Sequence, residues 1–104
     1  MYNGKLVPFY RNVKNQYEVY MSREKKKIER VQTGVRIEKR VLQVLKAISA
    51  KHDIGLGDLI EGIVLHSFEG KPPFGDEGLA FIEQMRAAYG LDLTAEDSHM
   101  LTEK

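Results

Sequence analysis

Residues 30–37 read Arg30-Val31-Gln32-Thr33-Gly34-Val35-Arg36-Ile37, and the fold that we expect depends on this stretch. Its side chains alternate in character. The odd positions are mainly apolar, while the even positions carry Arg30, Gln32, Gly34 and Arg36. A period of two is typical of a half-buried β-strand, in which successive side chains point to opposite faces. The stretch therefore predicts one short strand with an apolar face and an open, basic face.

The residues that follow this strand repeat with the period of a helix. Apolar side chains spaced three and four apart predict an amphipathic helix over residues 38–52. A turn is expected over residues 53–58, and the same spacing then predicts a second helix as far as Gly70, because glycine commonly ends a helix.

A sharp break separates these two helices from the last third of the chain. Lys71-Pro72-Pro73-Phe74-Gly75 cannot continue a helix and is expected to be a turn or linker. A third helix is expected over residues 77–89, ended by Gly90, and Thr94 is expected to cap a short acidic helix.

Charge is divided unevenly along the chain. Residues 1–52 hold 13 Lys and Arg against 4 Asp and Glu, a net charge of +9, while residues 53–104 hold 3 against 11, a net charge of −8. The overall net charge of +1 conceals this asymmetry. Because nucleic-acid phosphates attract the basic half and repel the acidic one, we expect the basic half to bind any nucleic-acid partner.

Composition and motif spacing argue against several classes of protein. The chain has 104 residues, no cysteine and no apolar run of about 18 residues, so we expect one small cytoplasmic domain without disulfides, thiolate metal sites or a membrane span. The histidines at 52, 66 and 99 have no metal-ligand spacing, and Ile60 stands where a dinucleotide fingerprint would place its third glycine. We therefore expect no catalytic residue, no metal and no cofactor, and hence no enzyme.

Two segments precede the predicted strand. Residues 1–22 combine aromatic residues with a turn and predict a hairpin or an extended arm, whose aromatic side chains either pack onto protein or stack on bases. Residues 22–29 form a basic connector. Its Lys25, Lys26 and Lys27 are either solvated surface or contacts to phosphates beside a groove.

A single strand also predicts an oligomer. Alone it would leave its backbone donors and acceptors unpaired, and a two-helix unit of roughly 40 residues has too small a core. We therefore expect an intertwined homodimer in which two strands pair antiparallel over the helices. The resulting ribbon would fit the DNA major groove, where Arg36 can bond guanine and Gln32 can bond adenine.

The segments Val35-Arg36-Ile37-Glu38, 41–48 and 53–60 are similar to parts of the ribbon-helix-helix domain of MetJ/Arc-type repressors. Outside these segments we expect an N-terminal arm over residues 1–29 and an acidic helical extension over 71–104, to which the resemblance does not extend. The resemblance implies a mainly α fold with one short β-strand, with the ribbon-helix-helix domain over 30–70. It implies that Gln32, Gly34 and Arg36 read bases. The residues expected to contact phosphates are Arg30, Lys25, Lys26, Lys27, Gly55, Leu56 and Gly57.

Two functions follow from these expectations. The first is a homodimeric transcriptional regulator that binds double-stranded DNA and uses residues 71–104 to extend the dimer, to bind a second dimer or to contact a protein. The second is a protein-interaction module similar to an antitoxin, in which the acidic segment 71–104 binds a partner protein.

Overall fold

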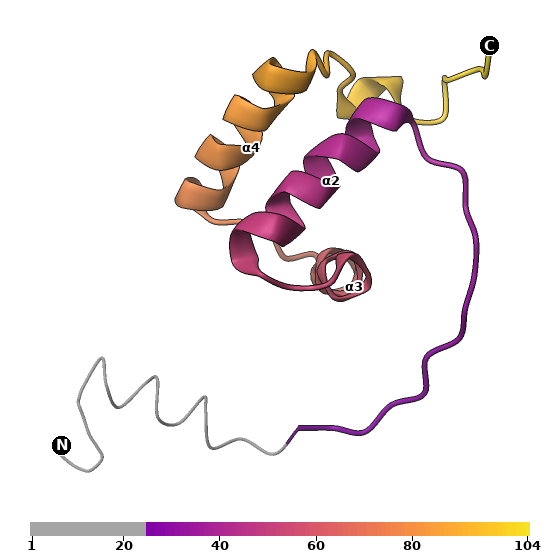
Figure 1. The fold of residues 1–104 in the computed structure, drawn as a ribbon, viewed down its shortest axis with the longest axis vertical. Coiled ribbons are helices and arrows are strands. Elements are labelled where there is room, and N and C mark those ends of the chain that lie inside the picture. The colour runs from indigo at the N-terminus through magenta and orange to yellow at the C-terminus, as the bar shows by residue number, and fades with distance from the viewer. Residues whose placement is uncertain (1–24) are drawn as a thin grey trace, which may run out of the picture. The chain divides into compact units, whose positions relative to one another are not determined.

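The computed structural model describes residues 25–104 (Figure 1). The arm or hairpin predicted over residues 1–22 lies outside the described residues. The chain divides after Gly34 into two units, and the second, residues 35–104, contains the helices α2 (Lys39–His52), α3 (Leu56–Phe68) and α4 (Asp76–Tyr89). A short 3₁₀ helix, η1 (Ala95–Asp97), follows α4.

Local capping interactions set the ends of the helices. The carboxylate of Glu38 accepts hydrogen bonds from the backbone N–H groups of Arg40 (2.8 Å) and Val41 (3.0 Å), which have no partner inside α2. At the C-terminal end of α4, Gly90 adopts the left-handed conformation (φ +67°) that glycine reaches without a steric penalty. The glycine signal is local, so the sequence could predict where α4 ends.

Helix α2 is the central element of the helical unit. It packs against both α3 and α4, whereas α3 and α4 make no such contact with each other (Figure 1). Val44 and Ile48 of α2 and Leu59 of α3 form the buried core. Partly buried side chains surround this core: Leu45, Ile63, Phe74, Phe81, Ile82, Met85 and Leu91.

The predicted strand is wrong for the described part of the chain. Residues 30–37 form neither helix nor strand and are all exposed, and no residue between 25 and 104 lies in a strand. The predicted ribbon-helix-helix fold with its two-stranded ribbon is therefore not observed, and this part of the protein is mainly α. The physical reason is that a strand is a pairing between two segments; an alternating pattern predicts which side chains share a side but not which segment will pair with them.

The predicted helices are confirmed. Helix α2 starts one residue later than expected and α4 starts one residue earlier. Helix α3 starts at Leu56, inside the predicted turn 53–58, and ends two residues before Gly70, and the short acidic helix is the 3₁₀ turn η1. Thr94 and Asp97 form a capping box around η1, with Asp97 Oδ2 accepting from the backbone N–H of Thr94 at 2.8 Å. Because α4 packs on α2, residues 76–89 belong to the same helical unit as α2 and α3.

Candidate nucleic-acid interface

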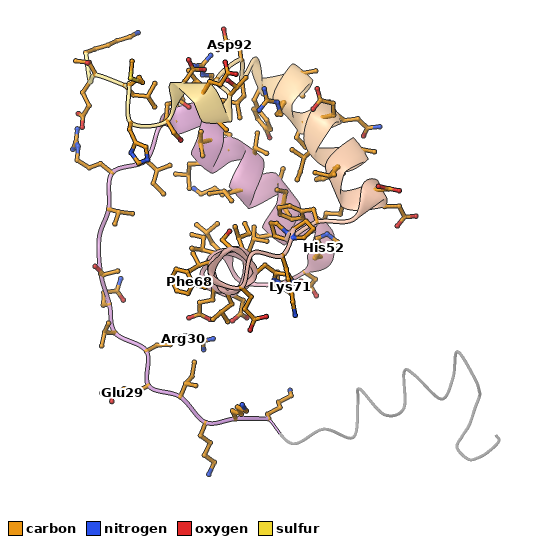
Figure 2. The ribbon with its side chains drawn as sticks, turned by 180° about the vertical axis from the view of Figure 1, so that it is seen from behind. Glu29, Arg30, His52, Phe68, Lys71 and Asp92 are labelled. Carbon is orange, nitrogen blue, oxygen red and sulfur yellow. The ribbon has the colours of Figure 1, made fainter. Side chains whose placement is uncertain are left out.

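Positive charge is concentrated in residues 25–40, which we call the basic segment. It contains seven Lys and Arg against two Glu, a net charge of +5, whereas residues 41–104 contain five against eleven, a net charge of −6. All of its residues are exposed except Glu38 and Arg40, and it leads directly into α2. Figure 2 shows the side chains of Glu29 and Arg30 on the coil that precedes this helix.

The three residues predicted to read bases all lie on this exposed segment. Gln32 and Gly34 lie in the part of the segment that forms neither helix nor strand. A Cβ added to Gly34 would meet no atom of the described residues within 4 Å. The backbone at Gly34 is therefore open to close approach by a large partner. Arg36, in contrast, is held by a specific contact within the helical unit.

Arg36 binds the carboxylate of Glu103 through two parallel hydrogen bonds. Arg36 Nε donates to Oε2 at 2.9 Å and Nη2 donates to Oε1 at 2.5 Å. The hydrogen bond raises the pKa of Arg36 and lowers the pKa of Glu103. An open depression of about 640 Å³ lies between residues 36–38 and 101–104, and the Arg36 side chain stays 84% exposed beside it.

Arg40 has a structural role at the start of α2. Its Nη1 donates to the backbone carbonyl of Gly90 (2.8 Å) and to Asp92 Oδ1 (3.1 Å), and its Nε donates to Glu38 Oε2 (3.0 Å). Figure 2 shows Asp92 near this end of α2. The hydrogen bond to Glu38 raises the pKa of Arg40. Arg40 thus ties the segment after α4 to α2.

Glu38 is the second titratable group of this cluster. The backbone N–H of Val41 lowers its pKa most, and bonds from Arg40 act in the same direction, while burial opposes them. The carboxylate is therefore held in its charged form at the N-terminus of α2, where a negative charge also favours the helix dipole.

The predicted phosphate site at Gly55, Leu56 and Gly57 coincides with the start of α3. Gly55 is the N-cap and makes no side-chain capping bond, and a Cβ added at Gly55 or at Gly57 would meet no atom within 4 Å. First-turn amides point out of a helix N-terminus and favour an anion there. The geometry is compatible with the predicted role.

Sequence reasoning missed the acidic partners of the arginines. The acidic half was expected only to be repelled by nucleic acid, yet Glu103 contacts Arg36 and Asp92 contacts Arg40. The members of the first pair are 67 positions apart, and no spacing rule connects them. The only available signal was the opposite charge of the two halves, which predicts attraction without naming the residues.

Comparisons and motif searches identify no family and no metal site. No protein-family model, curated protein or solved structure matches this chain. Within residues 25–104, no group of three or more His, Asp or Glu side chains could hold a metal ion. None of the helices in the same residues is long and apolar enough to cross a membrane.

Proposed function

We propose that this protein is a homodimeric DNA-binding regulator that binds duplex DNA through its basic segment. The observation that carries the proposal is the separation of charge: the basic segment, exposed except at Glu38 and Arg40, bears a net charge of +5, while residues 41–104 bear a net charge of −6. Cations that neutralise phosphates release condensed counterions, which drives binding to DNA of any sequence. The acidic remainder orients the protein with the basic segment toward the duplex.

Sequence preference comes from Arg36 and Gln32. The guanidinium of Arg36 meets Glu103 in the two-point geometry that it would use toward O6 and N7 of guanine. The carboxylate of Glu103 stands where a pair of acceptors on DNA would bind. Gln32 can bond adenine in the same two-point manner, and Gly34 permits close approach without reading a base itself.

Glu103 is readily displaced from Arg36 by DNA. The two side chains are 84% and 69% exposed, and exposed ion pairs contribute little net stability because water and salt screen them. A duplex presents many phosphates and base acceptors at once, so the bound state replaces one weak contact with several.

The proposal is tested by fluorescence anisotropy with a labelled duplex of about 30 base pairs and a randomised set of competitor sequences. Arg36→Ala should weaken binding to the preferred sequence by roughly 5- to 150-fold and relax the preference at one base pair in each half-site. Arg86→Ala is the matched control, since it removes one arginine from α4, outside the basic segment. Absence of any duplex binding at 50 mM salt would refute the proposed function, and equal losses on all sequences would assign Arg36 to phosphate contact.

A second candidate function is supported by the surface of the acidic end of the chain. Leu79, Met100 and Leu101 are exposed there among Asp and Glu side chains, as expected of a surface that binds a basic protein. In this alternative, residues 71–104 bind the partner protein, and DNA binding by the basic segment is a secondary activity. Duplex affinity that is weak and independent of Arg36 and Gln32 would favour it.

A further inference from the structure

Within the helical unit, residues 35–104, one apolar side of helix α3 is not covered. Only Leu59 is buried on this 13-residue helix, and α2 is the one helix of the described chain that packs against it. Phe68 is 80% exposed and Leu65 is 62% exposed, and Val64 beside them is exposed as well. Figure 2 shows Phe68 standing out from α3. Three large apolar side chains on one side of a short helix are unusual for a surface without a partner.

The residues on this side follow the spacing of a helix-pairing seam. Gly57, Glu61, Val64 and Phe68 are four, three and four positions apart, so they form a stripe along α3 on the side away from Leu59. Leu65 flanks the stripe. We call this set the α3 stripe.

Nothing in the described residues 25–104 accounts for a glycine at position 57. It lies in the first turn of α3 without a positive φ, and a Cβ at this position would meet nothing within 4 Å. Glycine weakens a helix relative to alanine, so neither backbone conformation nor internal packing accounts for it. A glycine on an apolar helix face instead makes room for a large side chain from outside.

We propose that the α3 stripe is the site at which a second copy of this chain docks, with the two α3 helices antiparallel and Phe68 of each copy seated over Gly57 of the other. The inference rests on the homodimeric state proposed above and names the surface that forms it. A two-fold axis between Gly62 and Ile63 pairs position 57 with 68 and position 61 with 64, because each pair is symmetric about that point.

The orientation follows from the residues on the stripe. A parallel pairing would set Glu61 against its own copy and Phe68 against Phe68, which brings like charges together and leaves Gly57 facing Gly57. The antiparallel pairing separates the carboxylates and sets the largest side chain of the stripe against the smallest. The opposed helix dipoles also favour this arrangement.

The extent of the surface sets the strength of the dimer. Stable interfaces bury about 800 Å² on each partner, and a helix of 13 residues spans only about 20 Å. We therefore expect a reversible dimer whose dissociation is measurable at micromolar concentration.

The test is sedimentation equilibrium of the full chain over a range of concentrations. Phe68→Glu should raise the dimer Kd at least tenfold, because it places a charge in the seam. Tyr89→Glu is the matched control, since Tyr89 is an exposed aromatic residue on α4, and it should leave the Kd unchanged. Circular dichroism of both variants should show the wild-type helix content, because substitutions at exposed positions usually change stability little.

A reciprocal exchange tests the pairing itself. Gly57→Phe and Phe68→Gly should each raise the Kd, whereas the double variant should recover most of the wild-type affinity, because the exchange preserves one large and one small residue at each contact. A double variant no better than the singles would overturn the antiparallel register.

The remaining outcomes separate this inference from the proposed function. A wild-type dimer that tolerates Phe68→Glu would overturn the docking site and leave the homodimer intact, while a wild-type chain that stays monomeric at hundreds of micromolar would overturn both. Loss of duplex affinity on Gly57→Phe with an unchanged dimer Kd would assign Gly57 to phosphate contact and refute its role in the seam.

Discussion

The three consecutive lysines at the start of the described chain provide a quantitative test of the basic segment. Lys25, Lys26 and Lys27 are all exposed, and glutamine keeps their length and polarity while removing the charge. We therefore consider the triple variant Lys25→Gln, Lys26→Gln and Lys27→Gln. If each lysine neutralises one phosphate, the variant loses three such contacts for every chain that is bound.

The expected magnitude follows from counterion release. Each phosphate contact contributes about −0.9 to the slope of log affinity against log salt, so the variant slope should be shallower by about 2.7 for each bound chain. The plots of log affinity against log salt for the wild type and the variant should converge near 1 M salt, where the electrostatic contribution is small. One decade below, at 0.1 M, the same slope difference corresponds to about a 500-fold loss of affinity for each bound chain.

The assay is fluorescence anisotropy on one duplex at five or more salt concentrations between 50 and 300 mM. The matched control replaces Lys46, Lys51 and Lys104 with glutamine, which changes the net charge equally at exposed positions outside the basic segment. Its slope should differ from the wild-type slope by less than about 1. Equal slope changes in the two triple variants would refute the assignment of DNA binding to the basic segment.

Three further perturbations test the helical unit. Ile48→Ala should lower the free energy of unfolding by about 2–5 kcal/mol in urea titrations, because Ile48 is buried between α2 and its neighbours, and a loss below about 1 kcal/mol would contradict the assigned core. Gly90→Ala should destabilise by about 1 kcal/mol because of the positive φ, whereas Gly62→Ala, which has no positive φ, should not destabilise. Glu38 has a lowered pKa, so its stabilisation is complete above the ordinary carboxyl value of about 4.3 and is lost as the pH falls through the folded value. Between pH 5 and pH 3 the Tm of the wild type should therefore fall more than that of Glu38→Gln, and parallel curves would argue against the cap.

The helices were predictable because their determinants are local. The stripe of α2, the glycine after α4 and the threonine before η1 each act within a few residues, and the structure places all three where the sequence does. An N-cap glutamate was not anticipated at residue 38, since glutamate is not among the strongly preferred N-cap residues.

The strand was not predictable in the same way, although its pattern is equally regular. Helical hydrogen bonds close within one segment, whereas strand hydrogen bonds need a second segment. The alternation over residues 30–37 contains no information on such a partner. The contact between Arg36 and Glu103 is unpredictable for the same reason, since it joins two distant positions through tertiary packing of α4 and the segment after it.

The apolar pattern of α3 shows a related limit of prediction from sequence. Its helical spacing includes both Leu59, which α2 covers, and Phe68, which no part of the described chain covers. A periodic pattern predicts that a side is apolar but not whether the same chain or another copy will bury it. If a second copy docks on this side as proposed, the burial adds hydrophobic free energy only on association, and folding stability then depends on protein concentration. With only three side chains buried in the helical unit, this contribution is large relative to the core, and the Tm should rise with concentration in the wild type more than in Phe68→Glu.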